Sequence, residues 1–295
     1  INSADADGTV LIGRSAGGAI TSGRQNVAIG YDALKSEDDG DYNVAIGYEA
    51  LMSQTGTSGT VGNTAVGWDS LKYVTTGTYN TALGYGAGLS LATGASNVVI
   101  GAEAGTYLLG SYSVAIGHKS MQYATGSYNT FVGYQAGYGG TTSAPFASGQ
   151  QNTAVGYWAL KGFTTGNQNV AIGQEALYSS TTGMYNAAVG YRSLYSVLGG
   201  YSNVAMGYES GINITTGALN VFVGHHAGYN NQTGVYNTNI GPLAGYGAVS
   251  NSSNTNTFVG YKTGYDVTDG GNNVAVGGMA LENLTSGADN IVIGN

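Results

Sequence analysis

The chain has 295 residues, of which 52 are glycine, 24 are tyrosine and none is cysteine; charged residues make up 8% and the net charge is -8. So few charges with so many aromatic residues exclude a disordered chain. The acidic balance argues against a nucleic-acid partner, because phosphates require a basic surface. Without a run of about 18 apolar residues we expect no membrane insertion. The chain begins at Ile1 without Met, and we interpret it as a piece of a longer protein.

Taken in chain order, one nine-residue pattern recurs. It reads NVAIGYDAL at 26–34, NVAIGYEAL at 43–51, NTAVGYWAL at 152–160 and NVAIGQEAL at 169–177. The glycine that follows the apolar triplet is never replaced, and it stands at positions 13, 30, 47, 67, 84, 101, 117, 133, 156, 173, 190, 207, 224, 241, 260, 277 and 294. Most of these 17 glycines are 17 residues apart, which predicts a single repeat domain over residues 1–295.

Each repeat has the period of a β-strand. Apolar and small residues alternate up to the glycine, and TTG at 75–77, 164–166, 181–183 and 215–217 marks turns. One such unit cannot bury a core, whereas stacked units can. The sequence therefore predicts an all-β fold, a parallel β-solenoid of 17 coils with a repeat of about 17 residues.

The alternation gives each strand two faces. Val27, Ile29 and Tyr31 share the large apolar face, and Ala28 and Gly30 share the small one. We expect the large face to fill the core of each coil, and the small face to be covered by other copies of the chain. Three coils carry phenylalanine on the small face, at Phe131, Phe222 and Phe258. This interpretation predicts a parallel homotrimer around a common axis.

Asparagine begins the strand in all coils except two, which carry Thr9 and Ser113. Stacked amides can hydrogen-bond along such a column. We therefore predict a structural asparagine ladder, whose members include Asn26, Asn43, Asn152, Asn169 and Asn186.

The candidates for chemistry are few. Most acids stand two residues after the glycine, as a solvated column (Asp32, Glu49, Asp69, Glu103, Glu175 and Glu209), and Arg192 shares that position between Glu175 and Glu209. We interpret the acidic run at 37–41 as a plain acidic turn. A calcium site is the alternative, because grouped carboxylates suit this cation. His118 and His225 stand where tyrosine is usual, and we expect His225 and His226 on opposite faces. We assign no metal, no cofactor and no catalytic residue.

Tyrosine recurs at two positions. The position after the glycine is predicted to stack as an aromatic column (Tyr31, Tyr48, Trp68, Tyr85, Tyr134, Tyr157, Tyr191, Tyr208 and Tyr261). The position before the asparagine is expected at exposed turn edges (Tyr42, Tyr79, Tyr128, Tyr185 and Tyr236).

The repeats resemble known fibrous proteins. NVAIGYEAL, NTAVGYWAL and SVAIGHKSM resemble the SVAIG repeats in the heads of YadA-type trimeric autotransporter adhesins. The longer stretch NTAVGYWALKGFTTGNQNVAIGQEALYSSTTG is similar to the repeat shafts of bacteriophage tail fibres. The resemblance covers essentially all 295 residues. It implies a left-handed β-roll with three chains around one axis, and no catalytic residues within the repeat.

The resemblance favours a structural and host-attachment segment of a phage tail fibre, located in the virion. The alternatives are the head of a bacterial trimeric adhesin at the cell surface and a polysaccharide-cleaving spike. The partner outside the trimer would be a cell-surface glycan or protein receptor.

Solenoids accept extra residues at their corners, and the longest interval carries YGGTTSAPFASGQ at 138–150. We predict receptor contacts at Tyr138, Pro145 and Phe146, with the 52–62 loop as a second candidate. The alternative is that the longer loop only caps a corner.

Overall fold

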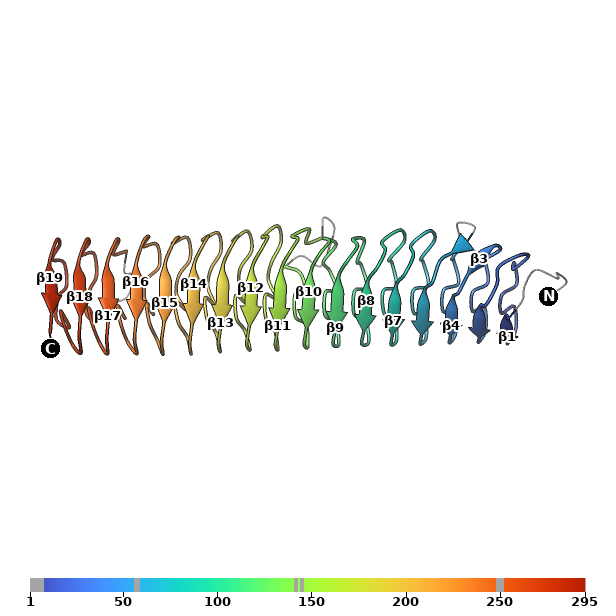
Figure 1. The fold of residues 1–295 in the computed structure, drawn as a ribbon, viewed down its shortest axis with the longest axis horizontal. Coiled ribbons are helices and arrows are strands. Elements are labelled where there is room, and N and C mark those ends of the chain that lie inside the picture. The colour runs from blue at the N-terminus through green and yellow to red at the C-terminus, as the bar shows by residue number, and fades with distance from the viewer. Residues whose placement is uncertain (1–7, 56–58, 141–142, 144–145, 248–251, 295) are drawn as a thin grey trace. The chain divides into compact units, whose positions relative to one another are not determined.

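The computed structural model describes residues 8–55, 59–140, 143, 146–247 and 252–294. They divide into two compact parts, residues 1–150 and 151–295. In the described residues of both parts, short strands are joined by turns (Figure 1). A search of these residues for a helix long and apolar enough to cross a membrane finds none.

The first part carries a column of parallel three-residue strands. They are β1 (Val10–Ile12), β2 (Val27–Ile29), β4 (Val44–Ile46), β6 (Thr64–Val66), β7 (Thr81–Leu83), β8 (Val98–Ile100), β9 (Val114–Ile116) and β10 (Thr130–Val132). Each strand pairs with the same strand of the next coil in register, so that Ala28 lies beside Ala45. Two shorter strands, β3 (Gly40–Asp41) and β5 (Gly59–Thr60), pair at a corner.

The second part repeats this arrangement. Its strands are β11 (Thr153–Val155), β12 (Val170–Ile172), β13 (Ala187–Val189), β14 (Val204–Met206), β15 (Val221–Val223), β16 (Thr238–Ile240), β17 (Thr257–Val259), β18 (Val274–Val276) and β19 (Ile291–Ile293). Parallel pairing brings Ala171 beside Ala188, 17 positions further along. The predicted all-β parallel β-solenoid with a repeat of about 17 residues is confirmed.

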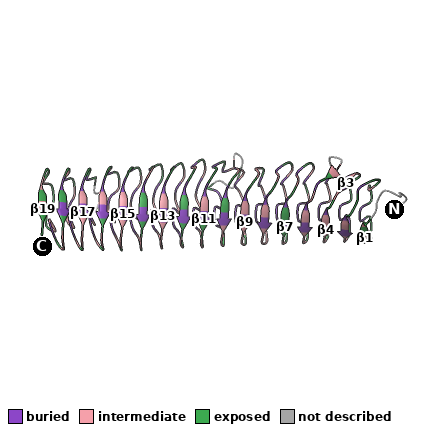
Figure 2. Cartoon of the chain, viewed as in Figure 1, coloured by how far each residue is buried: buried purple, intermediate pink, exposed green. Residues whose placement is uncertain are grey.

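The two faces of the strands are the reverse of the sequence expectation. Ala28 is fully buried inside its coil, whereas Val27 and Ile29 are only partly covered. Strands with both buried and more exposed positions recur along the chain (Figure 2). The three phenylalanines of the small face are also interior, with Phe131 and Phe222 fully buried and Phe258 1% exposed. These residues therefore do not indicate contacts between copies. A coil of 17 residues is so narrow that its opposite wall fills most of the interior.

The residue type on that opposite wall depends on the size of the interior strand residue. The position four residues after the strand-end glycine is leucine or methionine in most coils with an interior alanine, as in Leu34 beside Ala28. It is glycine where the strand residue is larger, and a Cβ there would lie within about 3.2 Å of that side chain: Gly17 with Leu11, Gly105 with Val99, Gly137 with Phe131, Gly228 with Phe222, Gly245 with Asn239, and Gly264 with Phe258. A large interior strand residue is thus accompanied by a small residue on the facing wall, and a small strand residue by a large one in most coils. The total volume of the core side chains therefore changes little.

The invariant glycine satisfies two constraints at once. Gly173 has φ +127°, a conformation that L side chains rarely adopt. A Cβ on Gly173 would also lie 2.6 Å from the carbonyl oxygen of Gly190 in the next coil. Either constraint alone disfavours a side chain, and together they explain why the glycine is never replaced.

The asparagine column is buried and hydrogen-bonded from coil to coil. Asn26 Oδ1 accepts a 2.8 Å hydrogen bond from the Asn43 backbone N–H. Asn152 Oδ1 accepts bonds from the Asn169 backbone N–H at 3.0 Å and from Asn169 Nδ2 at 3.1 Å. Asn186 is joined to Asn169 in the same way. The Nδ2 groups also donate to turn carbonyls of the following coil. Each amide thus connects three chain segments.

The exchange of core volume predicts a double-mutant result. Phe258→Ala should destabilise its coil by about 3–5 kcal/mol, because it leaves a cavity. Gly264→Leu alone should also destabilise, since its side chain would collide with the Phe258 ring. Together the two changes reproduce the Ala275 and Leu281 pair of the next coil, where Leu281 has φ 57°. The double variant should recover most of the loss in thermal unfolding and in hydrogen exchange at β17; additive losses would contradict the pairing.

The ladder predicts a graded response at Asn203. Asn203→Ala removes the acceptor of two bonds from Asn220, at 3.1 and 3.0 Å, and leaves buried polar groups unpaired. We expect a loss of about 1–3 kcal/mol for each such group. Asn203→Ser should cost less, because Ser113 Oγ accepts from the backbone N–H of Asn129 at this position. Hydrogen exchange at β14 and β15 measures both; equal losses would argue against the ladder as the cause.

Candidate binding surfaces and a pocket

An apolar face runs along the outside of each column of strands. It is formed by the first and third residues of the strands, and its members with the largest exposure are Val10, Ile12, Leu83, Val155, Val170, Ile172, Val204, Met206, Ile240, Val274, Val276, Ile291 and Ile293. Ile12 is 58% exposed and Met206 50%. We call this surface the outer apolar face. Because its members recur at the same strand positions, it differs from exposed apolar residues that are scattered singly over a surface.

The predicted aromatic column borders this face. Tyr31 and Tyr48 stack with ring centroids 5.2 Å apart, and Tyr48 and Trp68 stack at 4.4 Å. Tyr191 and Tyr208 stack at 5.1 Å in the second part. Stacking is confirmed for these five members of the predicted column, whose rings are partly exposed. The tyrosines before the asparagines are exposed at corners, as expected.

A third aromatic column was missed from the sequence. Tyr178 and Tyr195 stack at 4.9 Å, and Tyr229, Tyr246 and Tyr265 stack in succession at the same spacing. These residues stand five positions after the strand-end glycine. The signal was readable in the second half only, because lysine, leucine and threonine take that position in most earlier coils.

The acids after the glycine form an ion-paired column with unusual backbone geometry. Glu175 and Arg192 have φ of 57° and 51°, which turns this position outward at the corner. Arg192 Nε lies 2.6 Å from Glu175 Oε2. In the first part, Lys72 pairs with Glu49 and lies 3.3 Å from Asp69, and its hydrogen bond lowers the pKa of Glu49.

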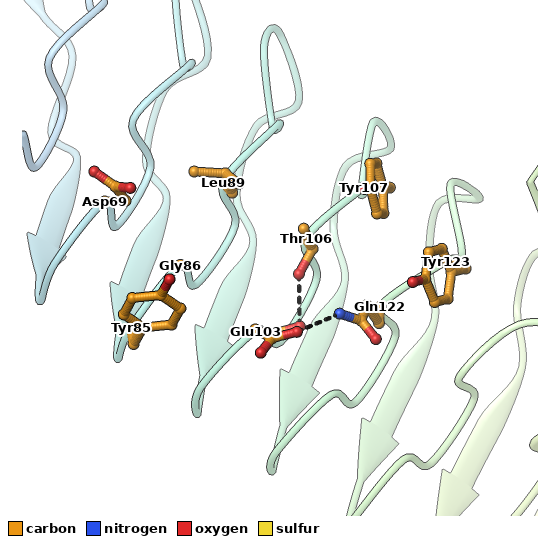
Figure 3. A pocket seen from close by; sticks show the side chains of 9 residues that line it. All are labelled: Asp69, Tyr85, Gly86, Leu89, Glu103, Thr106, Tyr107, Gln122 and Tyr123. Carbon is orange, nitrogen blue, oxygen red and sulfur yellow. Dashed lines mark hydrogen bonds between the residues drawn. The ribbon is translucent and has the colours of Figure 1, made fainter. Parts of the chain in front are cut away.

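One pocket interrupts this column in the first part. Its cavity volume is about 350 Å³, and it is lined by Asp69, Tyr85, Gly86, Leu89, Glu103, Thr106, Tyr107, Gln122 and Tyr123 (Figure 3). Gly86 stands at the position where the neighbouring coils carry Asp69 and Glu103, so a side chain is missing between two carboxylates. Glu103 is held by Gln122 Nε2 at 2.7 Å and by Lys119 at 3.6 Å.

Two described residues of the 138–150 loop pack beside this pocket. Phe146 lies against Tyr107 and Tyr123, with ring centroids 4.7 and 5.8 Å apart, and Tyr138 meets Tyr123 edge-on at 5.0 Å. Burial, with Tyr123 beside it, raises the pKa of Tyr138 to about 12. Phe146 is therefore partly covered by packing on the coil. Pro145 lies outside the described residues.

The acidic turn uses its carboxylates on the backbone. Glu37 is buried, and its Oε1 accepts from the N–H groups of Asp38 and Gly40 at 3.1 and 2.8 Å. Asp41 accepts from the Arg24 N–H at 2.7 Å. Glu37, Asp38 and Asp39 do lie close enough to hold an ion, but these hydrogen bonds account for the turn without one.

The two adjacent histidines lie together, contrary to expectation. Their ring centroids are 3.9 Å apart, with His225 stacked on Tyr208 and His226 Nε2 3.1 Å from Glu209 Oε2. The corner bend at His226, with φ 54°, brings both rings to one side. Burial, and next the neighbouring His225, lower the pKa of His226, while Glu209 opposes the shift.

Comparison of the chain with protein-family models, curated proteins and solved structures gives no match.

The His226 environment predicts a pH dependence of stability. Because its pKa is lowered from 6.5, the unfolded chain binds more protons than the folded one below that pH. The stability that neutral His226 contributes is therefore present above about pH 6.5 and is lost as the pH falls. His226→Asn should remove this dependence from hydrogen exchange at β15. An NMR titration that places the His226 pKa at or above 6.5 would contradict the analysis.

Proposed function

We propose that the chain is a structural and host-attachment fibre segment, similar to the repeat shafts of phage tail fibres, that forms a parallel homotrimer. In this proposal residues 1–295 form one repeat domain with the left-handed coil that the resemblance implies. The segment presents binding surfaces on a stiff support and performs no catalysis. Its place would be the virion.

The observation that supports the proposal is the outer apolar face. Valine, isoleucine and methionine recur on it, and its most exposed members lie 36–79% exposed in the single chain. Burial of such surface contributes about 25 cal/mol per Å². The face repeats at the same position in each coil, so another copy aligned in parallel meets complementary residues along the whole column. Three copies around an axis would cover it on every chain.

The surface that supports the trimer is not the one predicted from the sequence. The small alanine and glycine face lies inside each coil, so a charge at Ala171 would disrupt the coil and would not report on assembly. The trimer is now attributed to the opposite residues of the same strands, such as Val170 and Ile172, which are 37% and 41% exposed.

Attachment would use side surfaces of the assembled fibre. The predicted contact residues Tyr138, Pro145 and Phe146 belong to a loop that each chain of a trimer presents at one height. Weak contacts with a cell-surface glycan or protein receptor would then add through avidity. The 52–62 loop is a second candidate, and its residues 56–58 lie outside the described residues.

Assembly is tested by light scattering. The purified segment should have about three times the chain mass of 29.8 kDa. Ile172→Glu combined with Met206→Glu should shift the mass toward 29.8 kDa, because two carboxylates per chain would be buried without partners.

A matched control places the same charges elsewhere. Tyr185→Glu with Leu219→Glu adds two carboxylates at corners of coils with the same separation, and should leave the mass unchanged. A monomeric segment, or equal loss of mass in both variants, would refute assembly through the outer apolar face.

A further inference from the structure

The pocket at Gly86 is a missing member of a charged column. Asp69, Gly86 and Glu103 occupy one position in three successive coils. Gly86 has φ +58°, and a Cβ built there would have no atom within 4 Å. The backbone is therefore shaped for a side chain, as at Asp69 with φ 56° and Glu103 with φ 54°. The gap arises from the residue type alone.

The second part shows what completes such a column. There the same three positions are Glu175, Arg192 and Glu209, so that a cation stands between two carboxylates. The guanidinium of Arg192 lies 5.1 Å from the ring centroid of Tyr191 and 5.4 Å from that of Tyr195. Its Nε is 2.6 Å from Glu175 Oε2.

The first part carries the corresponding groups without the cation. Asp69 and Glu103 correspond to the two glutamates, and Tyr85, which is 58% exposed, corresponds to the tyrosine beneath the guanidinium. Asp69 and Glu103 line the gap. Asp69 shares the ammonium group of Lys72 with Glu49, and Glu103 pairs with Lys119, so three carboxylates face two ammonium groups. One negative charge of this group is left uncompensated.

Gln122 adds a second polar indication at the same place. Its side chain lines the pocket and is 4% exposed. Its Nε2 donates to Glu103, which fixes the amide orientation, and its Oε1 accepts no hydrogen bond from any described residue. A buried acceptor without a partner is costly.

We propose that this pocket binds a protonated amine carried by a sugar ring, that is, an amino sugar with a free ammonium group. The ammonium takes the place that Arg192 has in the second part, between Asp69 and Glu103 and beside the face of Tyr85. A volume of about 350 Å³ has room for a small ring as well as the charge. Tyr107 and Tyr123, stacked at 5.2 Å, supply an aromatic wall for the ring.

The inference rests on the proposed attachment function for the source of the ligand, a surface glycan. Its test does not depend on that function. Glucosamine and N-acetylglucosamine are titrated calorimetrically into the full segment at about pH 6, where an amine of this kind is protonated. Glucosamine should bind at least tenfold more tightly, because the acetylated sugar has the same ring without the charge. Equal binding of the two would overturn the proposal.

Two further variants use the correspondence between the parts. Gly86→Arg places a guanidinium in the gap and should abolish glucosamine binding, whereas Gly86→Asn, which tolerates positive φ without charge, should retain more of it. Arg192→Gly opens the corresponding gap between Glu175 and Glu209 and should create a second site. Unchanged binding in Gly86→Arg would place the ligand elsewhere and refute the proposal.

Two further measurements distinguish a sugar from a protein ligand, and the pocket from the trimer. Nα-acetyl-lysine amide serves as the probe for a protein source of the same charge; if it binds as tightly as glucosamine, the assignment to a sugar is wrong. Light scattering on the same samples separates the two proposals. A trimer that does not bind glucosamine refutes the pocket only, and a monomer that does bind refutes the trimer only.

Discussion

The constraint on which the structure depends is in-register parallel pairing between successive coils. Within each part, every strand pairs with the strand one repeat later, at equal positions. Each side chain therefore stacks on the residue at the same position of the next coil. A position that is asparagine, tyrosine or glycine in one coil is under pressure to remain so, because its neighbour is of the same kind. This accounts for the regularity of the sequence.

Stacking also explains why polar side chains can lie in the interior of the coil. Buried asparagines are tolerated because each one hydrogen-bonds to the next and to a turn carbonyl, so the cost of burying an amide is offset. With these polar groups satisfied inside, most strands direct a small residue to the interior, where leucine of the opposite wall packs, and direct valine and isoleucine outward. The result is a repeat fold whose single chain exposes valine and isoleucine to solvent.

Coils in which one residue differs in type from its neighbours in a column show how the fold compensates for the change. Phenylalanine on the strand is accompanied by glycine on the facing wall, as at Phe258 and Gly264, which keeps the core filled. Gly86 has no such compensation, because the column it interrupts is external. A gap inside the coil is filled by a neighbouring side chain, whereas a gap in an outside column between two carboxylates becomes a pocket.

The sequence by itself determined the strand positions, the parallel stack, the asparagine ladder and the position of the invariant glycine, because each follows from a local period. The tertiary structure decided which strand face is interior, since alternation defines two faces but only the opposite wall, such as Leu34, shows which one has room. It likewise brought His225 and His226 together and packed Phe146 on Tyr107. The pocket at Gly86 depends on side chains from several successive coils, whose distances and hydrogen bonds exist only once the coils are stacked.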